Sequence, residues 1–263
     1  SYLNMSSYEN KYEKLIMPFY GEKRNIQTDA TLLQENNNIL PHNYAIHDRI
    51  DMTKYDVYSI DPDGCEDADD AFSIFEEDDK LFLAIHIADP TEFINIESSL
   101  WKDIEEKIVT RYPSNRKPIH MLPEEIMEKS SLMVNKYGNI KLSLTILTEV
   151  NKKTYEPMGK IRLLFTKIKV NKENALSYEK AGSVIYSNDT IYNGLNISQA
   201  LYNLRSTKTK GAILNEISNS YPKYGNKASY LYRDTETEIL MKQMIAEFAI
   251  FANSFIGEYL KIH

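Results

Sequence analysis

The acidic segment Asp61–Asp70 is the part of this chain whose chemistry is easiest to interpret. Its ten residues read Asp-Pro-Asp-Gly-Cys-Glu-Asp-Ala-Asp-Asp and carry six carboxylates. Two like charges about 5 Å apart repel by roughly 3 kcal/mol at an effective dielectric of about 20, so a folded bend of this composition needs a counter-charge. Carboxylate oxygens are hard ligands that suit magnesium, manganese or calcium and do not suit zinc. The segment therefore predicts a site for a hard divalent cation.

The spacing of the acids predicts four metal ligands, at Asp61, Asp67, Asp69 and Asp70. Adjacent strand residues point to opposite faces, so Asp69 and Asp70 can serve different ions, while the bend returns Asp61 and Asp67 to the same place. Two magnesium ions about 3.5 to 4 Å apart would then clamp the attacking and leaving oxygens of an in-line phosphoryl displacement. With Asp69 and Asp70 as the catalytic carboxylates, this arrangement suits cleavage of a phosphodiester.

Two other interpretations of the segment compete with this one. Asp and Gly are common in solvated turns, but strand-like runs at Val57–Ile60 and Ala71–Phe75 place these acids at facing strand ends. An EF-hand calcium loop needs Gly at its sixth position and Glu at its twelfth. Counted from Asp61, those positions hold Glu66 and Phe72. The pattern thus favours magnesium or manganese over an EF-hand and leaves the solvated turn open.

The surrounding sequence predicts a fold of the α/β class, of the α+β type, with a central mixed or antiparallel sheet flanked by helices. The expected strands are 57–60, 71–75, 81–88, 140–150 and 158–170. The expected helices are 98–110, a short one opened by Pro123, 197–206 and 235–260. The segment 213–232 has the pattern of loop and short strands. In this fold we expect the acidic bend to lie at a sheet edge, in a cleft.

The charges are unevenly distributed along the chain. Residues 1–110 hold 9 Lys and Arg against 24 Asp and Glu, whereas residues 111–263 hold 22 against 14. An acidic part beside a basic remainder is what a metal site acting on a polyanion requires, although solvated faces give the same count. The single Cys65 excludes an internal disulfide and indicates a reducing, intracellular compartment such as the cytoplasm. No run of about 18 apolar residues predicts a membrane partner.

Two regions are expected along the chain. The first fifty residues are rich in Asn and weakly periodic, so residues 1–50 are interpreted as an N-terminal arm or extension. Residues 51–263 form the expected catalytic domain, because they hold the acidic segment and all the predicted strands.

Successive motifs of this second region resemble the RNB domain of the RNase II and RNase R exoribonucleases. The motifs are Ser59–Asp61 with Asp67–Ala71, Ala84–Asp89, Thr110–Pro113 and Met121–Glu125. Weaker similarity follows at 176–179, 211–213 and 246–253. The order and rough spacing agree from Ser59 to Asn253, and the first block is the most specific.

The resemblance implies hydrolytic degradation of single-stranded RNA from its 3′ end to nucleoside 5′-monophosphates, with magnesium or manganese. It implies that the four aspartates hold the metals and that loss of Asp69 is especially damaging. It also implies that Tyr112 packs on the terminal nucleotide and that Tyr178 lines the RNA path, since aromatic stacking in a basic channel suits sequence-tolerant binding of single strands. Each tyrosine has a plainer interpretation as a core residue, and His86 is interpreted as a strand residue.

The chain also departs from the family pattern. The family's domain continues past the helix matching 235–260, into a segment whose arginine grips the scissile phosphate, so the domain is expected to be incomplete at its C-terminal end. We expect a further C-terminal segment or a partner chain to supply that arginine. Candidates within the chain are Arg111, Arg116 and Arg205, and Arg116 in the basic turn after Tyr112 is the first choice.

Two further hypotheses remain beside the exoribonuclease. One is a catalytically impaired RNB-derived module that binds RNA or a protein; the absent arginine motif favours it, and the complete aspartate set opposes it. The other is a metal-stabilised structural protein, which would not need the basic second half of the chain.

Overall fold

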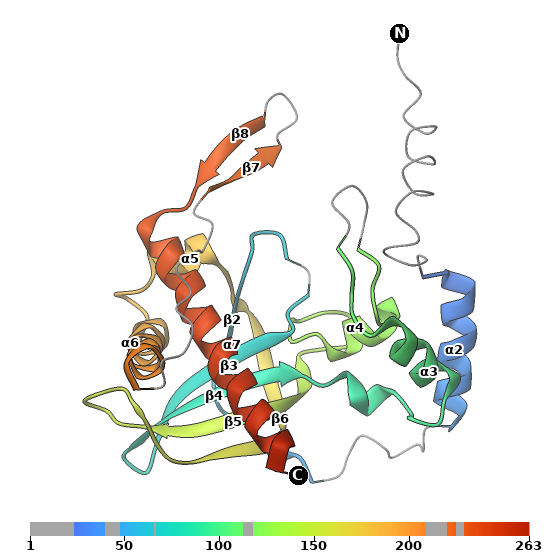
Figure 1. Cartoon of the computed structure of the whole chain (residues 1–263), viewed down its shortest axis with the longest axis horizontal. Coiled ribbons are helices and arrows are strands. Elements are labelled where there is room, and N and C mark those ends of the chain that lie inside the picture. Colours follow the sequence, from blue (N-terminus) through green and yellow to red (C-terminus); the bar gives the residue numbers. More distant parts are fainter. Residues whose placement is uncertain are drawn as a thin grey trace. The chain divides into compact units, whose positions relative to one another are not determined.

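The computed structural model describes residues 24–39, 48–65, 67–112, 118–208, 220–224 and 229–262 (Figure 1). Contacts divide the chain into two compact units. We call Asp48–Asp89 with Ser130–His263 the sheet unit, and Ser1–His47 with Pro90–Lys129 the helical unit. Most of the predicted arm over 1–50 lies outside the described residues, so that assignment stays a prediction.

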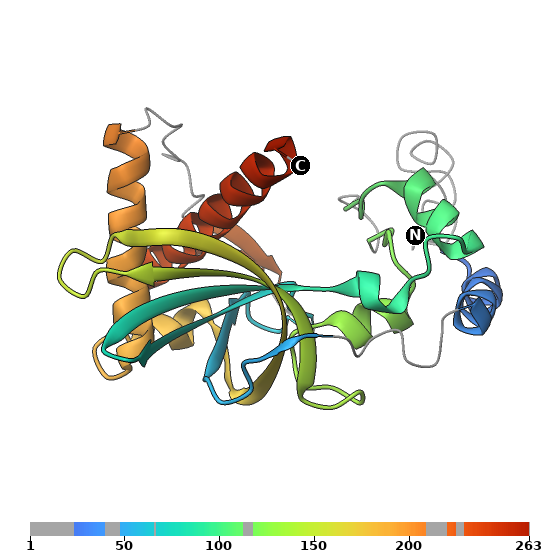
Figure 2. The same cartoon turned by 90° about the horizontal axis from the view of Figure 1, so that it is seen from below.

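The sheet unit is built on one six-stranded sheet with the strand order β1-β6-β2-β3-β4-β5. Its strands are β1 (Ile50–Asp51), β2 (Val57–Asp61), β3 (Asp70–Glu77), β4 (Lys80–Ala88), β5 (Ile140–Val150) and β6 (Pro157–Ser177). β1 and β2 run parallel to β6, and the other pairs are antiparallel, which confirms the predicted mixed sheet. β6 bonds to β5 as well as to β2, so the sheet closes into a barrel, and its curvature is visible in Figure 2.

Strand β6 is longer than the sequence predicts, because 158–170 was expected and Pro157–Ser177 is observed. Its first half pairs with β5, as in Leu144↔Phe165, and its second half pairs with β2, as in Ile60↔Leu176. The polar run 171–174 does not have a strand pattern, but β2 pairs with Val170 before it and with Ala175–Ser177 after it. A register shift between Val57 and Ser59 absorbs the irregularity.

Three helices, α5 (Tyr178–Ser183), α6 (Asp189–Asn203) and α7 (Glu236–Ile262), belong to the sheet unit. α6 and α7 lie on the same side of the sheet in Figure 2. Their apolar residues join one face of the sheet in a buried core that includes Phe72, Ile146, Ile197 and Phe248. The rings of Phe72 and Phe248 are 5.3 Å apart between centroids, edge to face. This core fixes β3, and with it the end of the acidic segment, against α7.

By length and composition α7 is also long and apolar enough to cross a bilayer. A single such helix is weak support for a membrane span, because core helices of soluble proteins have the same composition. In α7, the side chains of Met241, Met244 and Phe248 are buried in the core beside the sheet.

The opposite face of the sheet carries buried polar side chains. His86 in β4 is fully buried, with Nε2 3.0 Å from Ser73 Oγ and Nδ1 2.8 Å from Thr145 Oγ1. Thr145 Oγ1 lies 2.6 Å from Thr166 Oγ1, which continues the hydrogen bonding to β6. His86 is therefore a strand residue with satisfied nitrogens, as the sequence predicted.

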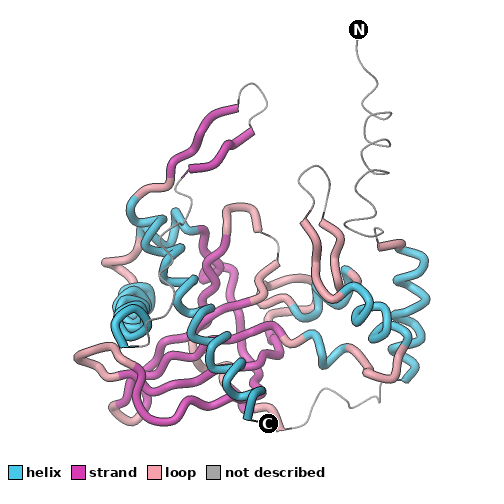
Figure 3. Tube along the Cα trace, viewed as in Figure 1, coloured by secondary structure: helices cyan, strands magenta, loops and turns pink. Residues whose placement is uncertain are grey.

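The helical unit contains α2 (Ile26–Ile39), α3 (Ser99–Lys107) and α4 (Glu124–Ser130), drawn in cyan in Figure 3. α2 was not predicted, since its only buried residues are Leu33 and Asn36 and its pattern is weak. Arg24 holds α2 to α3 through Asp29 and Asp103, at 2.8 and 2.9 Å. A separate two-stranded hairpin of β7 (Ser220–Tyr224) and β8 (Ser229–Arg233) occupies the expected loop and short-strand segment.

Candidate metal and RNA site

The backbone ladders of two strands fix both ends of the acidic segment. Asp61 is the last residue of β2 and pairs with Ser177, the last residue of β6. Asp70 is the first residue of β3 and pairs with Ile87 of β4. The next ladder bond runs from Ala88 N to the carbonyl oxygen of Asp69, at 2.8 Å. The segment is therefore a short loop between two held strand ends, as the flanking strand patterns predicted.

Within the loop, Ala68 is an anchor. It is fully buried, and its N–H donates to Ser131 Oγ at 3.3 Å. The Leu132 N–H donates to the Ala68 carbonyl oxygen at 2.9 Å. Because Ala68 faces the protein, its neighbours Asp67 and Asp69 are left at the exposed surface of the loop. The turn that precedes them uses Gly64 at a φ of 79°, a conformation that favours glycine.

The carboxylates of this loop perturb one another. Burial and repulsion by Asp70 raise the pKa of Asp61 to about 6. Partial burial raises the pKa of Asp69 and of Asp70, with added repulsion from Asp67 on the first and from Asp69 on the second. Asp69 and Asp70 still keep exposed surface, so a diffusing cation can reach them. The structure thus brings the four predicted aspartates into mutual electrostatic contact.

The donor set fits a hard divalent cation in its chemistry. Oδ2 of Asp61 is buried and has no hydrogen-bond partner, which is costly for a carboxylate oxygen unless a cation or water binds it. The neighbouring donors are all carboxylate oxygens. Within the described part of the chain, which omits Glu66, no three acidic, His or Cys side chains already form a ready metal cluster. The fit therefore rests on the ligand type and on the unsatisfied Asp61 oxygen.

Cys65 lies in the same loop and is exposed. Partial burial of the sulfur, together with the nearby Asp61, Asp67 and Asp69 carboxylates, raises the pKa of its thiol. A thiol held in its protonated form is a poor nucleophile. We therefore assign Cys65 no covalent part in the chemistry.

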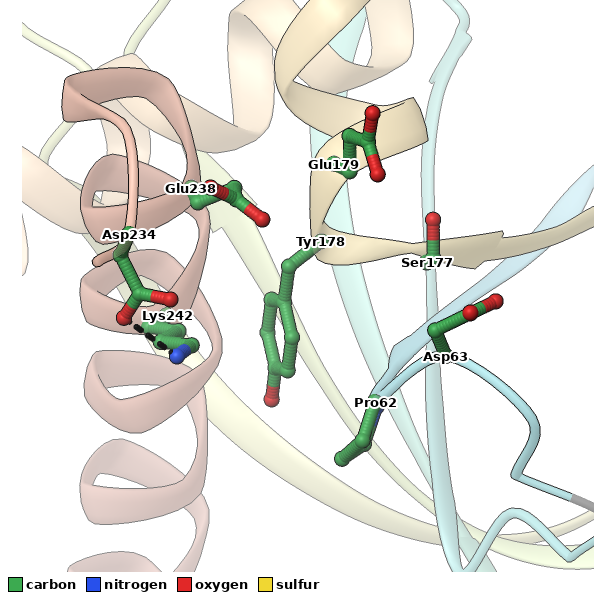
Figure 4. A pocket seen from close by; sticks show the side chains of 8 residues that line it. All are labelled: Pro62, Asp63, Ser177, Tyr178, Glu179, Asp234, Glu238 and Lys242. Atoms are coloured by element: carbon green, nitrogen blue, oxygen red, sulfur yellow. Dashed lines mark hydrogen bonds and ion pairs between the residues drawn. The ribbon is translucent and has the colours of Figure 1, made fainter. Parts of the chain in front are cut away.

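Tyr178, for which the family resemblance implies a place along the RNA path, lies close enough to Asp61 and Asp70 for their charges to act on it. Burial raises its pKa to about 12, and the charges of Asp61 and Asp70 add to the shift. Its ring points into a pocket of about 580 Å³ next to the acidic loop (Figure 4). The pocket is lined by Pro62, Asp63, Ser177, Tyr178, Glu179, Asp234, Glu238 and Lys242. An aromatic ring in an open pocket next to the carboxylates can stack with a nucleobase.

The far wall of this pocket was not predicted from the sequence. Lys242 is paired with Asp234 at 2.5 Å, and its Nζ lies 5.5 Å from the centre of the Tyr178 ring. The start of α7 is fixed by a capping box, since Glu238 N–H donates to Thr235 Oγ1 at 3.2 Å and Thr235 N–H donates to Glu238 Oε2 at 2.7 Å. The sequence Thr-Glu-Thr-Glu at 235–238 predicts this capping box, but no neighbouring residue indicates which loop the start of α7 faces.

The remaining predicted residues are a tyrosine in the other unit, an arginine outside the described residues and an arginine held in an ion pair. Tyr112 belongs to the helical unit and is 74% exposed, so it is not a core tyrosine. Arg116 lies outside the described residues. Arg205, another candidate for the phosphate, is held by Glu247, with Nε to Oε2 at 3.2 Å and Nη2 to Oε1 at 2.5 Å. Arg205 is therefore committed to an ion pair on α7.

Comparison with known proteins places this site in a family. Residues 49–263 match the RNB domain. The chain belongs to the RNB family. The RNB chain is 26% identical over 219 residues to Exoribonuclease 2 of Buchnera aphidicola, a match that covers 81% of the chain and 34% of that protein. The resemblance derived from the aspartate block is thus confirmed.

Solved structures show the same fold at low sequence identity. RNase R of Mycoplasma genitalium, in complex with ribose-methylated single-stranded RNA, superposes with a TM-score of 0.72 at 16% identity and covers 94% of the RNB chain and 39% of its own. Yeast Ssd1, a pseudonuclease, superposes with a TM-score of 0.62 at 18% identity and covers 83% and 27%. The RNB chain spans about a third of the length of these relatives.

Proposed function

We propose that the RNB chain is the metal-bearing part of an exoribonuclease that degrades single-stranded RNA from its 3′ end to nucleoside 5′-monophosphates. One curated relative is an exoribonuclease, and one structural neighbour was solved with single-stranded RNA. The observation that supports the activity most directly is the group of mutually repelling aspartates beside Tyr178. The single cysteine agrees with action inside the cell.

In this proposal Asp61, Asp67, Asp69 and Asp70 would hold magnesium or manganese, and the ion would supply Lewis-acid chemistry at the scissile phosphate. The exposed carboxylates of Asp69 and Asp70 face the RNA, and Asp61 supplies its unsatisfied buried oxygen as an inner ligand. Tyr178 stacks against a nucleobase and orients the chain of nucleotides past the loop. Tyr112 and Arg116 are proposed contacts of the RNA.

We also propose that full activity needs an arginine from a further C-terminal segment or a partner chain. Two observations support this. The matches cover only 34% and 39% of the two relatives, and Arg205 is held by Glu247. Loss of one contact to a developing negative charge costs about 3 kcal/mol or more, on the order of a hundredfold in rate. The chain alone is therefore expected to be a slow enzyme.

The direct test is hydrolysis of single-stranded RNA labelled at its 5′ end, with magnesium and with a chelator. We expect slow, chelator-sensitive shortening, with no release of the 5′ label in the first turnovers. RNA labelled at its 3′ end should release labelled mononucleotide at once. Early release of the 5′ label would contradict degradation from the 3′ end. Cleavage that continues in the presence of the chelator would contradict the proposed dependence on a metal ion.

The Asp69→Asn variant tests the residue assignment. Asparagine is nearly isosteric and removes one negative charge facing the phosphates, so hydrolysis should be lost while RNA binding stays equal or tightens. Asp56→Asn is the matched control, since Asp56 lies exposed just before β2 and is neither one of the four ligands nor part of the Tyr178 pocket. Equal loss of cleavage in both variants would contradict the assignment, and circular dichroism shows whether either has unfolded.

The alternative is a catalytically impaired RNB module that binds RNA or a protein. Its specific support is the likeness to yeast Ssd1, a pseudonuclease, at a TM-score of 0.62. In that case RNA binding would persist without cleavage in any divalent ion, even when an arginine-bearing C-terminal segment is supplied.

A further inference from the structure

Lys141 is a buried charge that the proposed chemistry does not use. It is the second residue of β5 and only 2% exposed. Its Nζ donates to Asn135 Oδ1 at 3.1 Å, and no other hydrogen bond of this ammonium is found among the described residues. A lysine is rarely this buried unless a negative group lies near it. Lys141 therefore needs a counter-charge.

The protein around Lys141 is the same segment that anchors the acidic loop. Ser131 and Leu132 hold Ala68 by the two hydrogen bonds described above. Asn135, the partner of Lys141, follows three residues later and is tied to Gly138 in a tight turn, with Gly138 N–H donating to its carbonyl oxygen at 2.9 Å. The hydrogen-bond partner of Lys141 thus lies on the segment that holds Ala68, three residues after Leu132.

The charge that acts on Lys141 comes from this loop. Burial lowers the pKa of the Lys141 ammonium, and the Asp67 carboxylate opposes that shift. Asp67 flanks the anchored Ala68 on the same short loop as Asp69. The acidic loop therefore combines exposed carboxylates with one buried lysine on which the charge of Asp67 acts.

We propose that Lys141 is the internal counter-charge of the acidic loop, which offsets carboxylate repulsion in the metal-free protein and weakens the binding of a divalent cation. This rests on the proposed metal site. Lys141 and a bound cation have charges of the same sign, and both are attracted to the same carboxylates. A fixed lysine therefore lets the loop stay folded without metal, and a bound ion is held less tightly than four carboxylates alone would hold it.

The test is calorimetric titration of manganese into the wild-type chain and into Lys141→Met. Methionine keeps most of the length of the side chain and removes its charge. We expect the Kd for manganese to fall by about three- to tenfold, the size expected for one unit charge acting on a divalent ion through partly hydrated surroundings. Lys141→Arg keeps the charge and should leave the Kd within about twofold of the wild type. Lys160→Met, exposed and early in β6, is the matched control and should not change it.

A merely structural role for Lys141 gives the opposite sign. If the lysine only fills space, its loss would loosen the segment behind Ala68, and manganese would bind more weakly or equally; either result overturns the inference. If circular dichroism shows that Lys141→Met does not fold, Lys141→Gln takes its place with the same expected fall in Kd. Absence of manganese binding in the wild type would instead refute the proposed metal site itself.

Discussion

The fully buried His86 should make the stability of the sheet unit depend on pH between 5 and 7.5. Burial lowers its pKa from the usual 6.5 to about 3, and its nitrogens contact only the neutral hydroxyls of Ser73 and Thr145. The unfolded chain takes up a proton at this histidine below pH 6.5, whereas the native protein does so only near pH 3. The contribution of neutral, buried His86 to the free energy of unfolding is therefore complete above pH 6.5 and is lost as the pH falls below that value.

The size of the loss follows from this pKa difference. Each pH unit within the window costs about 1.4 kcal/mol per proton, which gives about 2 kcal/mol between pH 7.5 and pH 5. The His86→Gln variant removes the titration and keeps polar atoms near Ser73 and Thr145. The free energy of unfolding of the wild type minus that of the variant should therefore fall by about 2 kcal/mol from pH 7.5 to pH 5.

Urea unfolding followed by circular dichroism at pH 7.5, 6.5, 5.5 and 5.0 measures this difference. The acidic loop also titrates in this range, but it does so in both proteins and cancels in the subtraction. Parallel stability curves for wild type and variant would refute the reasoning, because they would mean that His86 is protonated equally in the folded and unfolded chains.

Without metal, Asp61→Asn should raise the free energy of unfolding at pH 8 by about 1 kcal/mol, because the carboxylate, with its pKa of about 6, is ionised there at a cost to the fold. The variant should also abolish the rise in melting temperature that magnesium gives the wild type. An unchanged response to magnesium would contradict the role of Asp61 as a ligand. Ile108→Gly should stabilise the helical unit by about 1 kcal/mol in urea unfolding, since this 74% exposed residue ends α3 at a φ of 66°; a loss of stability would show that the side chain is needed. Gly182→Ala should lower the melting temperature and reduce the free energy of unfolding by about 1–3 kcal/mol, because the new Cβ would lie 2.8 Å from Thr237 Oγ1 and 3.2 Å from the Thr237 backbone. An unchanged melting temperature would mean that α5 and α7 separate without strain.

The sequence alone determined the elements that local pattern controls. β5 was predicted over the observed residues Ile140–Val150, and the strands on both sides of the acidic loop agree with prediction within two residues. These strands are marked by β-branched and apolar residues next to turn residues, so each can be recognised without knowing its partner. The same local information singled out the aspartates, because their density is unfavourable without a counter-charge.

Local pattern was not sufficient for elements whose stability comes from distant partners. The second half of β6 is polar and becomes a strand because β2 pairs with it, and α2 forms with a weak apolar pattern because Arg24 ties it to Asp103. A short sequence window contains neither partner, and tertiary contacts override weak propensity.

For the candidate site, the sequence supplied the ligand types and the tertiary structure decided what surrounds them. Closure of the barrel brings the end of β6, and with it Tyr178, beside Asp61 and Asp70. Packing of α7 adds Lys242 to the same pocket, and the start of β5 carries the buried Lys141, on which the charge of Asp67 acts. Charges far apart in the chain interact only through space, so their sign and spacing around the loop are set by the fold and cannot be read from neighbouring residues.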